Sequence, residues 1–192
     1  MRLPDGTIRK LRRNWNEVGH AHELTFCCRH RLPLLSKDRS RRWLIEALAA
    51  AREVHDVELW AYVIMPEHVH VLLWPRHPNY DVALIRKTIK QSVARRAIGY
   101  LRANAPQWLE RLLVVERGRR FHRFWEAGGG YDRNVEREEA AWIVVEYIHA
   151  NPVRRGLVAT PTEWPWSSAR WYAGEPEVLL AMDGCPTGPA DH

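Results

Sequence analysis

The sequence has few cysteines and no long apolar run, and each shortage narrows the class of protein. Only three of the 192 residues are cysteine, at Cys27, Cys28 and Cys185, and this set forms neither a disulfide framework nor a cysteine metal site. No apolar stretch is long enough to cross a membrane, and the basic N-terminus lacks the apolar core of a signal peptide. Internal repeats and low-complexity segments are also missing. We therefore expect a cytoplasmic protein that does not enter a membrane.

What the sequence has in excess is positive charge. It contains 29 lysines and arginines against 23 aspartates and glutamates, for a formal net charge of +6. Much of the excess lies near the N-terminus, where Arg12 and Arg13 are adjacent. This balance is typical of a protein that binds a polyanion, and nucleic acid is the first candidate.

The spacing of apolar residues predicts strands and helices in the order β-α-β-β-α-β, followed by a further helix. This order is that of a ferredoxin-like sheet with helices on one face, so the expected class is α+β. We expect a basic arm at 1–19, one domain at 20–172 and a loose tail at 173–192. The segment 105–120 shows no clear pattern. The predicted strands are 22–28, 57–64, 69–74 and a short one before residue 136, and the predicted helices are 40–55, 81–101 and 136–150.

Two histidines, His68 and His70, lie two residues apart at the start of the predicted strand 69–74. Alternate side chains of a strand point to the same face, so both imidazoles can reach one point in space. Two converging neutral imidazoles favour a divalent metal site. A second pair, His20 and His22, has the same spacing, and either pair could also consist of ordinary surface or core histidines.

A phenol and an amide lie one helical turn apart at the end of the predicted helix 136–150. Pro152 disfavours helical geometry at Asn151, which predicts that the helix ends there. Tyr147 and Asn151 could meet a histidine pair, one as nucleophile and one as third ligand. The alternative is a core tyrosine and an asparagine that caps the helix. The expected common face consists of Ala140, Ile143, Val144, Tyr147 and Asn151.

Five sequence blocks, in order and at similar spacing, resemble the single-tyrosine HUH transposases of the IS200-like family, and most closely their REP-associated branch. The two blocks that carry the paired histidines and the tyrosine are the most specific. The blocks begin with GHAHELTF and MPEHVHVLL, continue with GGGYDRN and YIHANPVRRGLV, and end with WPWSS. The resemblance leaves the residues after Tyr172 without a match.

The resemblance implies both a fold like the one above and a specific chemistry. In this family a tyrosine attacks a DNA phosphodiester with the help of a divalent metal ion, Mg²⁺ or Mn²⁺. Transferred by motif, Tyr147 is the nucleophile on a C-terminal catalytic helix, His68 and His70 are metal ligands, and Asn151 completes the metal site. The implied product is a 5′-phosphotyrosine with a free 3′-hydroxyl, from which strands can be rejoined.

The implied partner is single-stranded DNA beside hairpin-forming repeats, bound by a monomer or a homodimer. By the same resemblance, His20 and His22 lie outside the metal site. Two other functions stay open, a metal-free module that binds single-stranded nucleic acid and a metal-dependent hydrolase that uses water. The arginines expected to contact DNA are Arg12, Arg13, Arg133, Arg154 and Arg155.

Overall fold

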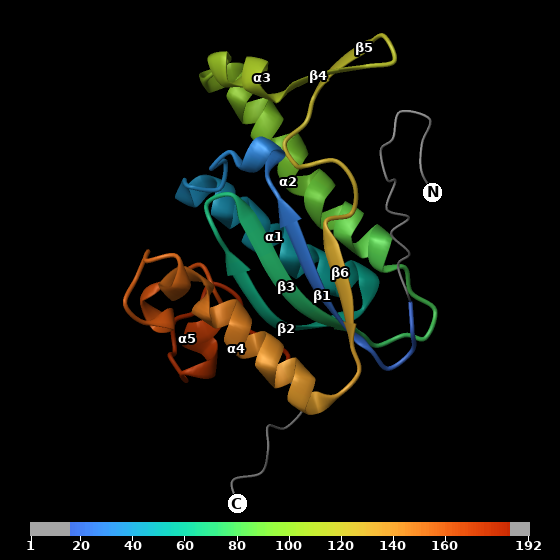
Figure 1. The fold of residues 1–192 in the computed structure, drawn as a ribbon, viewed down its shortest axis with the longest axis vertical. Helices are drawn as coiled ribbons and strands as arrows, with labels where there is room; N and C mark the ends of the chain where they lie inside the picture. Colours follow the sequence, from blue (N-terminus) through green and yellow to red (C-terminus); the bar gives the residue numbers. More distant parts are fainter. Residues whose placement is uncertain (1–15, 185–192) are drawn as a thin grey trace, which may run out of the picture.

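The computed structural model describes residues 16–184, which form one four-stranded antiparallel sheet with helices on both faces (Figure 1). The order of the strands across the sheet is β2-β3-β1-β6, which is the ferredoxin-like order and confirms the expected fold class. No helix in residues 16–184 is long and apolar enough to cross a membrane. The strands of this sheet are β1 (Ala21–Cys27), β2 (Val57–Ile64), β3 (His68–Pro75) and β6 (Tyr131–Val135).

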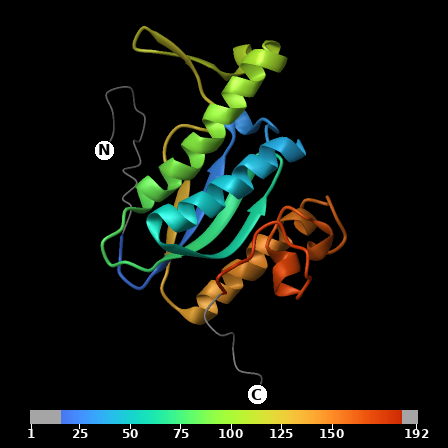
Figure 2. The ribbon, with the colours of Figure 1, turned by 180° about the vertical axis from the view of Figure 1, so that it is seen from behind.

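Helices α1 (Asp38–His55) and α2 (Val82–Asn104) cover one face of the sheet, which Figure 2 shows from the helix side. Alternate residues of β3 point into this layer, and Val69, Val71 and Leu73 are fully buried there. Burial of one such side chain contributes about 1.5–3 kcal/mol, so this layer holds the sheet and both helices together.

Helix α4 (Glu138–Arg154) crosses the opposite face and covers the side of β3 that carries the histidines. Leu72 is fully buried beneath it. Ile143 belongs to the expected common face with Tyr147, and it is 66% exposed, so this face is not the one that packs on the sheet. The helix is apolar on more than one side, so residue spacing alone did not define which side faces the sheet. Its buried side consists of Ala141, Val144, Val145 and Ile148.

The predicted end of this helix was wrong, because α4 continues through Pro152 to Arg154. A proline in a helix leaves the carbonyl four residues earlier without its usual donor, and here that carbonyl belongs to Ile148. The side-chain amide of Asn151 lies 3.5 Å from the Ile148 carbonyl and donates to the Tyr147 carbonyl at 2.8 Å. A side-chain donor thus lies near the carbonyl that proline leaves without a backbone partner.

The segment 105–120, for which the sequence showed no clear pattern, projects from the end of α2 (Figure 1). Its short elements are α3 (Gln107–Leu112), β4 (Leu113–Glu116) and β5 (Arg119–His122). Both residues of the β4–β5 turn have positive φ, +51° at Arg117 and +75° at Gly118. Such a turn matches the twist of a two-residue hairpin, and glycine adopts it without strain.

The C-terminal segment runs along the outer edge of β2. The backbone N–H of Ile64 donates to the Trp166 carbonyl at 2.8 Å, and the N–H of Leu59 donates to the Asp183 carboxylate at 2.9 Å. This segment also contains η2 (Pro161–Glu163) and α5 (Ala169–Tyr172), while η1 (Arg29–Arg31) follows β1.

The part of the expected tail that the structure describes, residues 173–184, packs against the body of the protein instead of lying loose. Leu180 and Met182 are buried in the same core as α1 and α2. The carboxylate of Asp183 also lies 3.5 Å from Arg52 of α1. The ordered body therefore extends beyond residue 172, while the proposed arm at 1–19 falls largely outside the described residues.

Candidate active site

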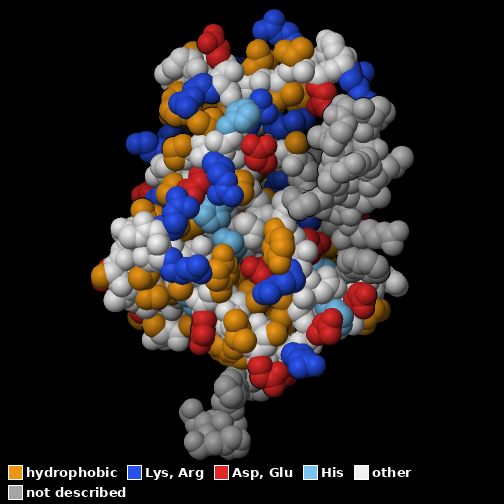
Figure 3. All heavy atoms as spheres, viewed as in Figure 1, with side chains coloured by type: hydrophobic (Ala, Val, Ile, Leu, Met, Phe, Trp, Pro, Cys, Tyr) orange, Lys and Arg blue, Asp and Glu red, His pale blue; other side chains and the backbone are white. Residues whose placement is uncertain are grey.

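A cavity of about 350 Å³ opens between the histidine side of the sheet and the C-terminal end of α4. Figure 3 looks onto this side and shows histidine atoms at the surface with several cationic side chains around them. The cavity contains all four residues predicted for the catalytic site. Its lining residues are Thr25, Cys27, Arg31, His68, His70, Tyr147, Asn151, Arg154 and Arg155.

The two imidazoles and the phenol lie side by side in this cavity. The ring centroids of His68 and His70 are 5.0 Å apart, and those of His70 and Tyr147 are 5.6 Å apart, each pair in an edge-on arrangement. Tyr147 is 40% exposed, so a substrate can reach its ring. The structure thus brings together side chains that are almost 80 positions apart in the sequence.

Each histidine is oriented through its Nδ1 atom. Nδ1 of His68 lies 3.1 Å from Oε1 of Glu67, and Nδ1 of His70 lies 2.8 Å from Oγ1 of Thr25. The second contact follows from strand register, because Thr25 of β1 is directly opposite His70 of β3. Both rings therefore keep Nε2 as the nitrogen that can bind a ligand, an arrangement usual for metal-binding histidines.

Burial keeps both imidazoles uncharged near neutral pH. It lowers the pKa of His70 to about 3, with a smaller contribution from the neighbouring His68. It also lowers the pKa of His68, although the Glu67 carboxylate acts in the opposite direction. A neutral imidazole has the lone pair of electrons that a metal ion needs. The two histidines can therefore bind a cation without first losing protons.

Asn151 supplies the third candidate ligand. Its amide nitrogen is directed to helix carbonyls, as described above, which leaves Oδ1 as the atom that can bind a cation. Within the described residues, no three histidine, cysteine, aspartate or glutamate side chains are grouped so as to hold a metal ion. The set of two imidazoles and one amide oxygen fits a cation that keeps open positions for substrate oxygens.

Arginines give the cavity its positive charge. Arg154 lies over the ring of Tyr147, with Cζ 5.1 Å from the ring centroid, and Arg155 pairs with Glu67 at 3.0 Å. Arg133 lies outside the cavity lining, where it pairs with Glu23 at 2.9 Å. The two N-terminal candidates, Arg12 and Arg13, fall outside the described residues.

The rival pair does not converge on the cavity. His22 is fully buried on the α1–α2 side of the sheet, with Nδ1 3.0 Å from Asp132 and Nε2 2.8 Å from the Tyr80 hydroxyl. Both of its ring nitrogens are thus engaged. His20 contacts the side-chain amide of Asn134 at 3.3 Å.

The sequence reasoning missed four residues of this site. Glu67 directly precedes His68, and this adjacency was a readable signal for a carboxylate that orients the ring. Thr25, Cys27 and Arg31 reach the cavity only through the pairing of β1 with β3 and the turn that follows. No local pattern identifies them.

Comparison with known proteins places the chain in a family. Residues 18–151 match the family model described as transposase IS200 like. A solved structure of a REP-associated tyrosine transposase bound to a REP hairpin is 22% identical, covers 95% of this chain and 96% of its own, and superposes with a TM-score of 0.66. A Deinococcus radiodurans structure assigned as a transposase is 20% identical over 72% of this chain and 95% of its own, with a TM-score of 0.44. None of the curated proteins is significantly similar. Since the family model spans most of the chain and the fold agrees, the chain belongs to the IS200-like transposase family.

Proposed function

We propose that the protein is a metal-dependent endonuclease and strand transferase that cuts single-stranded DNA beside repeat hairpins through a 5′-phosphotyrosine. The observation that supports this most directly is the single cavity in which Tyr147 lies beside the paired imidazoles. Family membership supports DNA strand transfer in general. The likeness in fold to a REP-associated transposase with a bound hairpin makes repeat hairpins, and the REP-associated branch, the first choice.

The reaction requires a nucleophile, a positioned phosphate and a leaving group. The hydroxyl oxygen of Tyr147 attacks the scissile phosphorus and forms a new P–O bond, while the bond to the 3′ oxygen breaks. The phenol loses its proton and the 3′ oxygen leaves as a hydroxyl. Because the phosphotyrosine retains the energy of the diester, attack by another 3′-hydroxyl reverses the step and joins strands without a nucleotide cofactor.

The residues of the cavity divide this work. His68, His70 and Asn151 would hold Mg²⁺ or Mn²⁺, which supplies charge neutralisation at the non-bridging phosphate oxygens. Arg154 stabilises negative charge that develops on the phenol, and Arg31 and Arg155 are placed to contact phosphate. Thr25 and Glu67 keep the imidazoles in their binding orientation. Whether a monomer or a homodimer carries out the reaction stays a prediction.

The decisive experiment incubates the protein with end-labelled, hairpin-bearing single strands and Mn²⁺, followed by denaturing gels. We expect a covalent protein–DNA adduct that disappears in Tyr147→Phe, because the variant lacks only the attacking oxygen. Cleavage that survives Tyr147→Phe without an adduct would instead indicate a hydrolase that uses water. Binding without cleavage would indicate a metal-free binding module.

Tyr131→Phe is a matched control for this experiment. Tyr131 is 50% exposed and lies on β6, opposite Thr25 in the sheet, but does not line the cavity. The substitution removes the same hydroxyl from a similarly exposed tyrosine near the site. It should therefore form the adduct at close to the wild-type rate, which shows that loss of a phenol oxygen matters only at Tyr147.

A further inference from the structure

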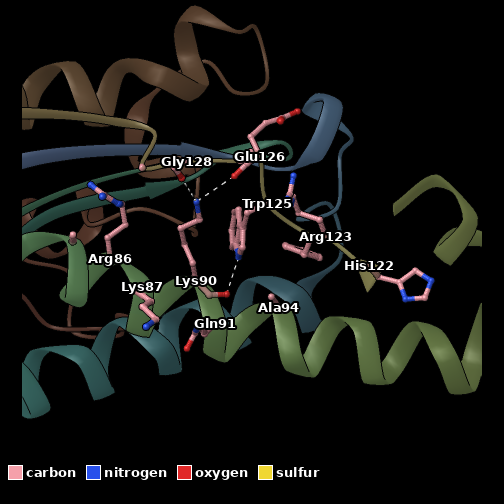
Figure 4. A pocket seen from close by; sticks show the side chains of 14 residues that line it. Arg86, Lys87, Lys90, Gln91, Ala94, His122, Arg123, Trp125, Glu126 and Gly128 are labelled. Carbon is pink, nitrogen blue, oxygen red and sulfur yellow. Dashed lines mark hydrogen bonds between the residues drawn. The ribbon is translucent and has the colours of Figure 1, made fainter. Parts of the chain in front are cut away.

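A second cavity, of about 520 Å³, lies between α2 and residues 122–129, and the function above leaves it without a role. Figure 4 shows Lys90 rising from α2 between Arg86 and Trp125 toward Gly128. Trp125 joins the two walls of the cavity, because it is buried and its indole N–H donates to the Lys90 carbonyl of α2 at 2.8 Å. The volume lies within the usual range of ligand sites.

The cavity is rich in positive charge. Arg86, Lys87, Lys90 and Arg123 line it, and Glu126 is the one acidic residue among its lining residues. The Glu126 side chain extends away from Lys90 in Figure 4, and its carboxylate accepts from the backbone N–H of His30 at 2.5 Å. Two of the cations already have a carboxylate partner: Arg86 pairs with Asp132 at 3.8 Å, and Arg123 pairs with Glu116 at 3.1 Å. An anion in the cavity would therefore be attracted mainly by Lys87 and Lys90.

Lys90 is held in place by neutral acceptors, and its nearest carboxylate acts on it only from beyond ion-pair distance. Its ammonium group donates to the carbonyls of Gly128 at 3.1 Å and Glu126 at 3.4 Å, which are neutral acceptors. Among the described residues, Lys90 has these two carbonyls as its hydrogen-bond partners, and Lys87 is exposed. Burial, and then the nearby Arg86, lower the pKa of Lys90 to about 8. A bound anion would offset both effects, because a negative charge nearby stabilises the charged form of the lysine.

The cavity lies close to the catalytic cavity, on the other side of β1. Cys27 lines the catalytic cavity, while the ring of Phe26 lies 5.9 Å from the ammonium of Lys90. The backbone of Glu126 is hydrogen-bonded to Cys27 at 2.8 Å, so the glycine segment 128–130 passes the edge between the two cavities. Because the three glycines have no side chains, they add little bulk at this edge, and a DNA strand can cross it close to the backbone.

Gly129 also sets the shape of the new cavity. A Cβ at this position would lie 2.7 Å from Nη2 of Arg86 and would push the guanidinium out of place. The absence of a side chain at Gly129 therefore leaves the Arg86 guanidinium in its present position at the rim of the cavity.

We propose that the cavity between α2 and residues 122–129 binds backbone phosphates of the same single-stranded DNA, on a part of the strand that has passed over the glycine segment from the catalytic cavity. The inference rests on the proposed function and adds to it a second contact region. A strand held at both places is fixed in register, so this region would set which phosphate reaches Tyr147.

The test compares a short oligonucleotide, which fills only the catalytic cavity, with a longer one that extends in either direction. Affinities are measured by fluorescence anisotropy at several salt concentrations for the wild type and for Lys87→Gln/Lys90→Gln. We expect the wild type to bind the longer strand more tightly, and the double variant to lose about tenfold of this advantage. Its salt slope on the longer strand should fall by about 1.

The matched control is Arg95→Gln/Arg102→Gln, which removes the same charge from exposed positions of α2 outside the cavity. It should keep the advantage of the longer strand. If melting curves show that the loss of Lys90 disturbs folding, Lys87→Gln alone is used, because the Lys87 side chain is exposed. This single variant should lose about threefold of the affinity advantage of the longer strand.

Failure of this inference differs from failure of the proposed function. A wild type that makes no adduct on any oligonucleotide ends the proposed function. A wild type that makes the adduct but binds long and short strands equally, or a cavity variant that retains the advantage, overturns the second contact region. A stronger length effect with RNA of the same sequence, or equal displacement of both strands by inorganic phosphate, overturns the assignment to DNA.

Discussion

Glu67 and Arg155 form an ion pair in which Nη1 of Arg155 lies 3.0 Å from Oε1 of Glu67. The same oxygen lies 3.1 Å from Nδ1 of His68. Arg155 directly follows α4, which carries Tyr147, whereas His68 begins β3. One buried carboxylate thus links the helix of the proposed nucleophile to the strand of the proposed metal ligands, and the two are positioned together.

Glu67→Gln should weaken metal binding without unfolding the protein. Glutamine still offers an acceptor to His68 but loses the charge that holds Arg155, and such orienting contacts are usually worth about tenfold or more in metal affinity. We expect about a tenfold weaker Kd for Mn²⁺ by titration calorimetry. Glu146→Gln, an exposed acid on α4, is the control and should bind like wild type. Equal affinity in both variants would remove Glu67 from this role.

His70→Ala should abolish cleavage while DNA affinity stays within about tenfold of wild type, because most affinity comes from phosphate contacts elsewhere. His68→Ala should behave in the same way. His20→Ala is the matched control, since this ring belongs to the rival pair and contacts Asn134. Cleavage and anisotropy assays on the same oligonucleotide check both effects. A His70→Ala variant that cuts at the wild-type rate would refute the assigned ligands.

Acid should destabilise the fold through its buried histidines. Burial lowers the pKa of His149 to about 4, from an ordinary value near 6.5, and that of His70 to about 3. The unfolded chain therefore takes up protons first as the pH falls below 6.5, and the free energy of unfolding declines toward pH 4. His149→Gln should remove roughly 3 kcal/mol of this decline in urea titrations. His77→Gln, at an exposed position, should leave the pH profile unchanged.

Two glycine substitutions should have opposite effects on stability. Gly130 has φ +74°, and a Cβ there would lie 2.0 Å from the Thr25 carbonyl, so Gly130→Ala should cost more than about 2 kcal/mol. Gly99 lies within α2 with open space around its Cα, so Gly99→Ala should add about 0.5–1 kcal/mol. Thermal or chemical denaturation measures both effects. A Gly130→Ala variant as stable as wild type would contradict the close approach of Gly130 to the Thr25 carbonyl of β1.

The main sheet and its helices were predictable from sequence because each has a clear apolar period. The predicted strand 57–64 matches β2 residue for residue. The segment of β4 and β5 was not predictable, since these strands have four residues each and are largely exposed, so burial leaves no pattern in them. The end of α4 was mispredicted because the helix continues through Pro152, and residue order does not reveal the side-chain amide that lies near the carbonyl left without a backbone partner.

The candidate site was predictable where function requires particular residue types close together in sequence, as in His68 and His70. Tyr147 came from a separate block, and only the fold shows it beside His70. Thr25 and Arg31 became visible through tertiary structure alone, because strand pairing and a turn bring them to the cavity. A residue such as Thr25, which orients a ligand side chain, belongs to no sequence motif that would identify it.

The C-terminal segment along β2 has a consequence for self-association. A sheet edge with free backbone groups can recruit a strand from another molecule, which is a route to aggregation. Trp166 and Asp183 already occupy backbone groups of β2, so this edge is shielded. Any intermolecular strand addition to the main sheet is thereby directed to the other margin, along β6.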